Sequence, residues 1–328
     1  MEAERVAGST VRTAKTSKGC VALLLIFLVV APSVLFPGDA PARRSGAAPV
    51  PTFSLAAPGL GAPTPAESST VTAAPERYTF RSLTRDFLKD AGQIWSYPVH
   101  IQARDVLPIA GLATLTGLLI ANDESIHRGF QTFRADNGWA RAVSPVITTM
   151  GSWGAWGTAG LFLGVGLIAG DKTSKETGVL AINAMLQSQI LVTFLKGLFG
   201  RQRPEAAGGV DHWSGPVGLI KMFEKGNTGL YDSFPSGHAI TAFSLATILA
   251  MQYRDTVWVP VLSYTVATGV GLSRVILSKH WLSDVLVGSA LGYVVGRLVV
   301  RNHRQRYQLA PAAGLDHGTL GLTVSLAR

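Results

Sequence analysis

The sequence predicts an all-α membrane protein: a six-helix transmembrane bundle preceded by a signal-like segment and a disordered linker. Of the 328 residues, 47% are hydrophobic and only 15% are charged, whereas a soluble domain usually carries about 25% charged residues. The apolar residues are also clustered, in six segments: 106–121, 150–170, 177–199, 236–253, 257–274 and 281–300. The longer segments reach the ~20 residues that span a bilayer, and the shorter ones lie near the lower limit.

The N-terminal part of the chain lies outside this bundle. Basic residues precede an apolar run that begins at Cys20, so residues 1–36 are predicted to be a signal peptide or signal anchor. Residues 37–75 are rich in Ala, Pro, Gly and Ser, which predicts a disordered linker. Because Cys20 is the only cysteine, the chain forms no internal disulfide and no cysteine-based metal cluster.

Two further segments flank the predicted core, which covers residues 106–300. In residues 76–105, apolar side chains recur at helical spacing among charged ones. This pattern indicates an amphipathic helix at the membrane interface or a soluble capping helix. Residues 301–328 form a basic tail that ends in alternating apolar residues, which predicts a short strand.

A row of glycines marks the last apolar segment. Gly288, Gly292 and Gly296 repeat every four residues, so another helix backbone can approach this face closely. We expect that partner to be a helix of the same chain rather than a second copy, although the sequence does not fix the oligomeric state.

The net charge of +9 restricts the class of partner. No basic stripe with interleaved aromatic residues is present, so nucleic acid is not expected. Lys and Arg fall mostly between the apolar segments, as they do in the loops of membrane proteins. The basic balance therefore favours the bilayer, with its anionic lipid head groups, and a phosphate-bearing lipid as substrate.

Polar residues that are unusual in membrane helices gather where the predicted helices end: Lys196, Arg201, Arg203, Ser236, Gly237, His238, Arg274, His280 and Asp284. If consecutive helices alternate in direction, all these ends lie on one side of the membrane. We therefore expect one site at the helix ends. The stretch 205–232 between two of the clusters is interpreted as a surface loop that overhangs this site.

The composition of these clusters predicts phosphate binding. Lys196, Arg203 and Arg274 have no carboxylate partner nearby in the sequence, so an anion is expected among them, and Arg suits bidentate contact with phosphate oxygens. Ser236 is placed to cap the fourth helix. The amide of Gly237 would then lie at the positive end of that helix, which favours anions.

Two histidines and a carboxylate predict the reaction. His280 and Asp284 are four residues apart, so on a helix they share a face. A carboxylate bonded to one ring nitrogen leaves the other nitrogen free to attack. His238, on another helix, is then the proton donor, and the set predicts phosphoryl transfer through a phosphohistidine. No metal-ligand spacing is evident, so neither a metal nor another cofactor is expected.

The same residues resemble the motifs of the type-2 phosphatidic acid phosphatase (PAP2) superfamily, which includes bacterial acid phosphatases and vanadium haloperoxidases. Its motifs K-x6-R-P, P-S-G-H and S-R-x5-H-x3-D correspond here to KGLFGRQRP (196–204), PSGH (235–238) and SRVILSKHWLSD (273–284). The resemblance spans roughly residues 106–300.

This resemblance implies a role for each matching position. It assigns phosphate binding to Lys196, Arg203, Ser236, Gly237 and Arg274. It implies that His280 is the nucleophile, that Asp284 orients it, and that His238 protonates the leaving group. It also implies that no divalent metal is needed.

Several functions remain open. The favoured one is an integral membrane lipid phosphatase acting on undecaprenyl pyrophosphate, phosphatidic acid or phosphatidylglycerol phosphate. The signal-like N-terminus is compatible with an exported acid phosphatase of broad specificity, and vanadium haloperoxidase is a third alternative, since vanadate mimics phosphate. A non-catalytic lipid-binding or lipid-transporting membrane protein is disfavoured, because binding alone needs neither His280 nor Asp284.

The distribution of basic residues predicts the orientation in the membrane. Arg residues come after the last helix, and Lys172 and Lys175 join the second and third. By the positive-inside rule they are cytoplasmic, so a multi-pass protein of a bacterial-type inner membrane is expected, with its active site facing the periplasm. An exported N-terminus conflicts with this orientation. Either residues 1–36 do not translocate the segment C-terminal to them, or one short segment such as 106–121 is not a full span.

Overall fold

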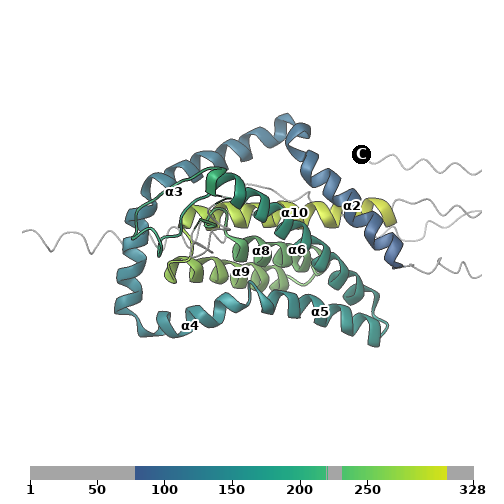
Figure 1. The fold of residues 1–328 in the computed structure, drawn as a ribbon. Helices are drawn as coiled ribbons and strands as arrows, with labels where there is room; N and C mark the ends of the chain where they lie inside the picture. The colour runs from purple at the N-terminus through teal and green to yellow at the C-terminus, as the bar shows by residue number, and fades with distance from the viewer. Residues whose placement is uncertain (1–77, 219, 221–230, 309–328) are drawn as a thin grey trace, which may run out of the picture.

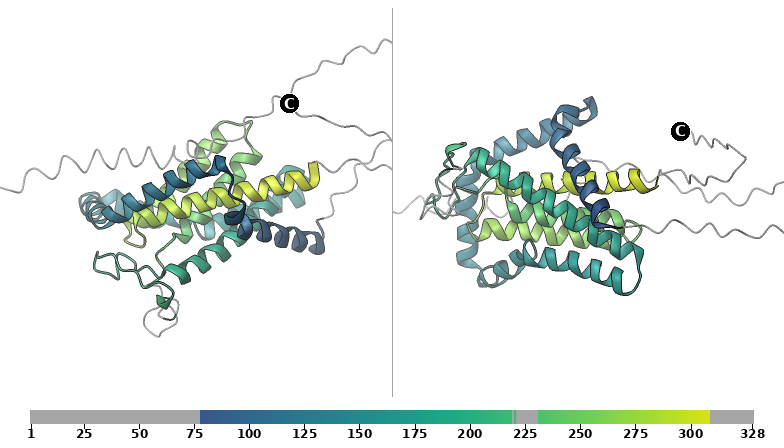
Figure 2. Two further views of the ribbon diagram at one scale, coloured as in Figure 1. Left: turned by 90° about the horizontal axis from the view of Figure 1, so that it is seen from above. Right: turned by 45° about the vertical axis from the view of Figure 1, so that its right-hand side comes forward.

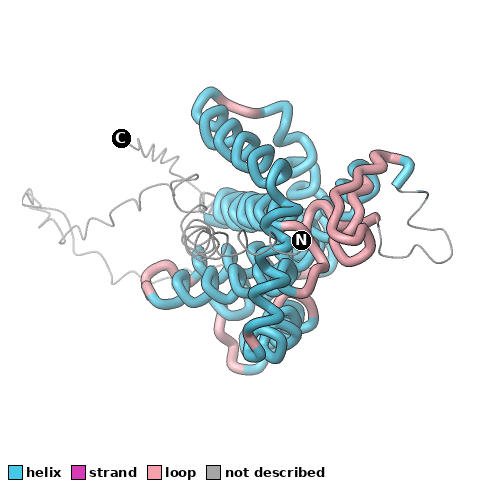
Figure 3. Tube along the Cα trace, turned by 90° about the vertical axis from the view of Figure 1, so that its left-hand side faces the viewer, coloured by secondary structure: helices cyan, strands magenta, loops and turns pink. Residues whose placement is uncertain are grey.

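The computed structural model describes residues 78–218, 220 and 231–308. In these ranges the order of elements is α2 (Phe80–Ser96), η1 (Tyr97–His100), α3 (Ala103–Asp136), α4 (Gly138–Thr149), α5 (Trp153–Ile168), α6 (Lys172–Phe199), α8 (Gly237–Gln252), α9 (Trp258–Ile276) and α10 (Leu282–Gln308). The described ranges contain no strand (Figure 3), only a single β-bridge between Arg201 and Trp213. An all-helical fold is therefore confirmed for this part of the chain (Figure 1).

Three predictions fall on residues that lie outside the described ranges. These are the signal segment 1–36, the linker 37–75 and the strand near the end of the 301–328 tail.

Four of the helices are long and apolar enough to cross a membrane: α3, α6, α9 and α10. Helices α5 and α8 are apolar but have only 16 residues each, short of the ~20 that span a bilayer. Each of the six predicted apolar segments thus falls on a helix, and four of these helices reach spanning length. A bundle of six full spans remains a prediction.

The region between the first two apolar segments differs from the prediction. Segment 106–121 is part of a 34-residue helix, α3, and the next helix, α4, was not predicted at all. Charged residues such as Asp123 and Arg128 interrupt the apolar pattern there. They do not interrupt the helix, because the face that carries Asp123 and His127 is buried against the rest of the protein.

The central helix is α8, which packs against α6, α9 and α10. A Cβ atom added at Gly292 of α10 would lie 2.4 Å from the carbonyl oxygen of Ile240 in α8, and one at Gly288 would lie 2.6 Å from that of Ser236. The glycine row therefore lets two backbones meet, as helix packing within a bilayer requires. Packing of this row within the chain, rather than between copies, is confirmed.

The helices that carry the predicted site alternate in direction. The C-terminal ends of α6 and α9 and the N-terminal ends of α8 and α10 lie at one end of the bundle, on the left in Figure 1. The segments that carry the predicted site residues therefore meet at this end.

Helix α2 lies against the other end of α10 (Figure 2). Its buried residues are two carboxylates, Asp86 and Asp90, and the apolar Ile94. Asp90 accepts hydrogen bonds from Asn183 at 2.7 Å, from Asn302 at 2.8 Å and from Arg306 at 2.8 Å. Each bond comes from α6 or α10, so the polar face of α2 holds it to the bundle.

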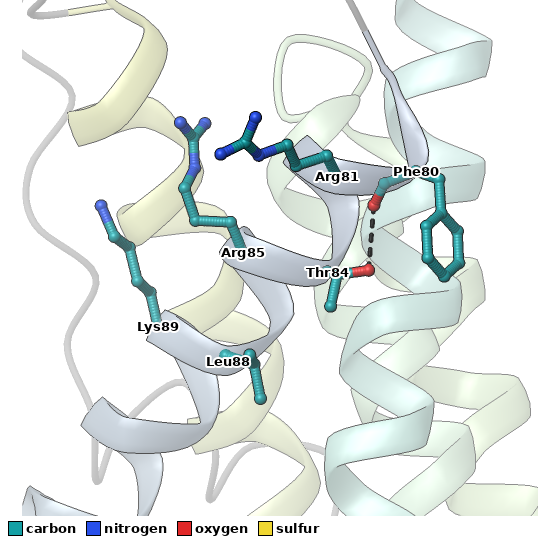
Figure 4. A pocket seen from close by; sticks show the side chains of 6 residues that line it. All are labelled: Phe80, Arg81, Thr84, Arg85, Leu88 and Lys89. Carbon is teal, nitrogen blue, oxygen red and sulfur yellow. Dashed lines mark hydrogen bonds between the residues drawn. The ribbon is translucent and has the colours of Figure 1, made fainter.

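The outer face of α2 combines apolar and basic residues (Figure 4). The side chain of Phe80 is 87% exposed and that of Leu88 is 62% exposed. Together with Arg81, Arg85 and Lys89 they line a shallow surface hollow of ≈ 590 Å³. Exposed apolar side chains beside a basic row are typical of helices at a membrane interface.

Candidate active site

Two of the predicted phosphate-binding cations lie together and share a carboxylate that the sequence analysis did not include. Arg203 donates to both oxygens of Asp232, from Nε at 2.7 Å and from Nη2 at 2.9 Å. Lys196, near the end of α6, lies with its Nζ 3.3 Å from Asp232 Oδ2. Burial alone would raise the pKa of Asp232, but the charges of Lys196 and Arg203 outweigh burial, so its pKa lies below the ordinary value. The carboxylate is therefore ionised.

The third predicted cation has no such partner. Arg274 is 7% exposed at the end of α9. Its Nη1 donates to the hydroxyl of Thr148 at 3.1 Å, and its buried Nε has no hydrogen-bond partner among the described residues. No carboxylate forms an ion pair with it in the same ranges. A buried guanidinium without a counter-charge is costly, so this position favours an anionic ligand.

The start of α8 lies beside these cations. The hydroxyl of Ser236 caps the helix and accepts from the amide of Ala239. A Cβ atom added at Gly237 would lie 3.7 Å from Lys196 Nζ, so the first turn of α8 and the lysine are in contact. His238 is the next residue in that first turn, within electrostatic reach of Arg274, Lys196 and Arg203. The positive end of a helix thus joins the cation cluster.

The ring of His280 is held by a backbone carbonyl. His280 is 1% exposed in the loop before α10, and its Nδ1 lies 2.7 Å from the carbonyl oxygen of Ser233. Because a carbonyl can only accept, Nδ1 carries the hydrogen and Nε2 keeps the free lone pair. Burial, and then the charges of Lys196, Arg274 and Arg203, hold the pKa of His280 well below its ordinary value. The ring is therefore neutral at neutral pH.

Asp284 does not make the direct bond that was expected. Its nearest oxygen is 3.7 Å from His280 Nδ1, because α10 begins at Leu282 and His280 precedes the helix. Instead, Asp284 accepts from the hydroxyl of Ser233 at 2.6 Å and from the amide of Trp281 at 2.9 Å. It thereby fixes the two segments that hold the imidazole, the one with Ser233 and the one next to His280.

A single arginine joins this carboxylate to two others. Arg201 is fully buried, and its Nη1 donates to Asp284 at 2.6 Å, while its Nη2 donates to Asp123 at 2.8 Å and to Asp211 at 2.7 Å. Burial lowers the pKa of Arg201, but the three carboxylates more than offset this effect and leave its pKa above the ordinary value. Arg201 is thus a permanent charge at the centre of the support for Asp284.

Aromatic and hydroxyl groups complete the surroundings of Arg201. The guanidinium carbon lies 4.5 Å from the ring centroid of Trp213 and 5.2 Å from that of Trp281. The hydroxyl of Ser283 donates to Asp123 and accepts from Arg201. The network therefore links α3, the segment after α6 and the start of α10.

Sequence reasoning missed four participants, Asp123, Asp211, Asp232 and Ser233, of which two illustrate different reasons. Asp232 stands three residues before Pro235, the first residue of the PSGH motif, but it is 29 residues from Arg203, so spacing alone did not pair them. Asp123 lies two residues beyond the predicted segment 106–121, so the sequence did not place it inside a helix. In the structure it lies within a helix of spanning length, where an ionisable residue usually has a partner and a function. In the described ranges, no group of three or more His, Cys, Asp and Glu side chains is arranged to hold a metal ion.

Comparisons with known proteins agree on one family. A profile of the PAP2 superfamily matches residues 177–308. A lipid A 1-phosphatase of Porphyromonas gingivalis is 47% identical over 68 residues, which cover 20% of this chain and 15% of that protein. A decaprenylphosphoryl-5-phosphoribose phosphatase of Mycobacterium tuberculosis is 34% identical over 144 residues, which cover 43% of this chain and 71% of that protein.

The chain also matches a solved structure, and it spans only part of the length of several relatives. The crystal structure of a PAP2 type phosphatidylglycerolphosphate phosphatase from Bacillus subtilis is 24% identical, with a TM-score of 0.45, and the match covers 70% of this chain and 98% of that one. Among the matching lipid A phosphatases, the chain spans only 15% to 53% of the relative's length.

Proposed function

The chain belongs to the PAP2 superfamily, and we propose that it hydrolyses a phosphate or pyrophosphate group of a membrane lipid through a phosphohistidine intermediate. The observation that carries the proposal is the state of His280, a buried, neutral imidazole whose Nδ1 is committed to the Ser233 carbonyl at 2.7 Å. Its other nitrogen is a free nucleophile in a region that Lys196, Arg203 and Arg274 make positive. A nucleophile beside phosphate-binding cations suits attack on phosphorus.

In the first step, the lone pair of His280 Nε2 attacks phosphorus and the bond from phosphorus to the lipid oxygen breaks. The leaving oxygen takes a proton from His238, which therefore enters this step as the imidazolium. Burial and the charges of Arg274, Lys196 and Arg203 lower the pKa of His238 in the site without phosphate, so its protonation depends on the negative charge that the bound phosphate group brings next to it. Lys196, Arg203 and Arg274 stabilise the charge on the phosphoryl oxygens, together with the Ser236 hydroxyl and the Gly237 amide. The N–H of Nδ1 remains bonded to Ser233, which stabilises the positive charge that develops on the ring.

In the second step, water attacks the phosphohistidine. His238, now neutral, accepts the proton of that water, and the bond from phosphorus to Nε2 breaks. Inorganic phosphate leaves, and both histidines return to their starting states. Asp284 touches no reacting atom in this scheme. It is a positioning residue, because it holds Ser233 and the backbone beside His280.

The proposed substrates are lipids whose phosphate lies at the membrane surface. Four helices in the described part of the chain are long and apolar enough to cross a membrane, which supports a multi-pass membrane protein. The site lies at the ends of helices, and we propose that this is the depth of a lipid head group. The candidates are undecaprenyl pyrophosphate, phosphatidic acid and phosphatidylglycerol phosphate. The names of the relatives add lipid A carrying a 1-phosphate.

Phosphate release by the detergent-purified protein tests this proposal. We expect release from at least one of the four lipids in the presence of EDTA, and much slower release from p-nitrophenyl phosphate, which has no lipid tail. Turnover of the soluble ester alone would contradict a lipid phosphatase and favour a broad acid phosphatase. No release from any of the five, with inorganic phosphate still bound, would favour a non-catalytic binding protein.

We also propose that the site faces the periplasm of an inner membrane and that α2 lies in the opposite, cytoplasmic interface. The basic residues Lys172, Lys175 and Arg306 support this orientation, because they lie at the end of the bundle away from the site. The outer face of α2 supports it as well, since Arg81, Arg85 and Lys89 are suited to anionic head groups there (Figure 4).

Cysteine labelling in whole cells tests the orientation. In a Cys20→Ser background, Val210→Cys is expected to react with a membrane-impermeant maleimide in cells whose outer membrane alone has been permeabilised. Val210 lies near the site and is 46% exposed. The matched variant Arg81→Cys, on exposed α2, is expected to react only after the inner membrane is opened. The reverse pattern would invert the proposed topology.

A further inference from the structure

Asp232 binds side-chain nitrogen atoms of Lys196 and Arg203 that the proposed mechanism assigns to the phosphate group of the substrate. Both of its oxygens are engaged, one by Nε of Arg203 and the other by Nη2 of Arg203 and by Lys196, at 2.7 to 3.3 Å. The side chains of all three residues are 15% to 18% exposed, so the ion pairs are only partly screened by solvent. A carboxylate and a phosphate present the same pair of oxygens to an arginine fork.

We propose that Asp232 is a displaceable internal anion, which fills part of the phosphate site in the resting protein and is expelled when a phosphate group binds. The proposal rests on the proposed function, because it takes Lys196 and Arg203 as phosphate ligands. Charge favours the exchange: a phosphate monoester carries up to two negative charges, whereas the carboxylate carries one. In the proposed mechanism phosphate also contacts Arg274, which forms no ion pair with a carboxylate within the described residues and whose Nε has no hydrogen-bond partner there.

Competition of this kind has a defined effect on affinity. The apparent affinity for any ligand equals the affinity of the open site multiplied by the fraction of molecules in which the site is open. If the carboxylate holds the two cations about nine-tenths of the time, phosphate binds about tenfold more weakly than it does to the open site. Substrate and inorganic phosphate lose the same factor. The lipid tail adds binding energy for the substrate alone, so the net result is easier release of the product.

A different role for Asp232 predicts the opposite result. If the carboxylate stays in place and holds Arg203 in position for phosphate, then its removal weakens phosphate binding and slows the reaction. The sign of the change in affinity therefore separates an internal competitor from a positioning residue.

Titration calorimetry of the full-length, detergent-purified protein with inorganic phosphate tests the proposal. We expect Asp232→Asn to bind phosphate about tenfold more tightly than the unaltered protein does. The matched control is Asp255→Asn, which removes the same charge from the exposed pair between Arg254 and Asp255. This control is expected to leave phosphate affinity unchanged, so a general effect of net charge is excluded.

Two further measurements complete the test. Asp232→Ala is expected to tighten phosphate binding in the same way, which guards against a folding defect of one variant. Where lipid turnover is measurable, the KM and the inhibition constant of phosphate are expected to fall by the same factor. Unchanged or weaker phosphate binding by both variants overturns the proposal. Binding needs no catalysis, so a protein that hydrolyses no lipid would refute the proposed function and still give this result.

Discussion

Replacing His280 by Ala is expected to lower phosphate release from the lipid substrate by at least about 10⁴-fold, since loss of a catalytic nucleophile typically costs this much or more. The physical reason is that Nε2 of His280 forms the covalent bond to phosphorus, and no other imidazole in the described site is held in the same tautomer by a carbonyl. Phosphate release from the preferred lipid, in detergent with EDTA present, is the measurement.

A second readout separates chemistry from folding. A labelled terminal phosphate is expected to be trapped on the unaltered protein as an acid-labile, base-stable adduct, and the His280→Ala protein is expected to form none. The matched control is His212→Ala, because His212 is an exposed histidine on the same side of the molecule. It is expected to keep both activity and adduct. Activity above about one hundredth of the original in His280→Ala, with no phosphoenzyme in either protein, would contradict the nucleophilic role.

The sequence predicted which segments meet more accurately than it predicted which atoms touch. The spacing of Lys196, Arg203, Arg274 and His280 relative to the apolar segments placed them all at one end of an alternating bundle, and the structure brings these ends together. This inference needed only the periodicity and the alternating direction of helices. It did not depend on the exact position of any side chain.

The contacts of the imidazole could not be predicted in the same way. The hydrogen-bond acceptor for His280 is the backbone of Ser233, and a carbonyl group is present at every position of the chain. The four-residue spacing to Asp284 predicted a direct bond only on the assumption that both residues lie within one helix. Since α10 begins at Leu282, the carboxylate acts on the histidine through the segments next to it.

The burial of charged side chains was the second feature that the sequence did not predict. The K-x6-R-P motif distinguished Arg203 from Arg201, but nothing in the sequence indicated that Arg201 would be the buried one. The two differ in depth: Arg201 is fully buried with three carboxylates, whereas Arg203 is partly exposed with one. Depth is set by tertiary packing, in this case by α3 crossing the start of α10, and the sequence did not predict the second half of α3.

Replacing Arg201 by Met is expected to destabilise the protein by about 3–5 kcal/mol, the usual cost of removing one partner from a buried ion pair. The side chain of Met fills a similar volume, but Asp123 and Asp284 are then buried without a cation. The midpoint of thermal unfolding in detergent is the measurement. Arg254→Met is the matched control, because Arg254 is about half exposed and its pair with Asp255 is at 3.9 Å; no measurable change is expected there.

The double variant Arg201→Met with Asp123→Asn tells whether the loss arises from unpaired charge. When the arginine is absent, neutralising Asp123 removes one of the stranded carboxylates. The double variant is therefore expected to be more stable than Arg201→Met alone, although Asp123→Asn by itself is expected to destabilise the protein. Such a reversal of sign is the mark of direct coupling between two residues. If Arg201→Met unfolds at the same temperature as the unaltered protein, the network does not stabilise the fold, and its role would be confined to holding Asp284 beside the reacting histidine.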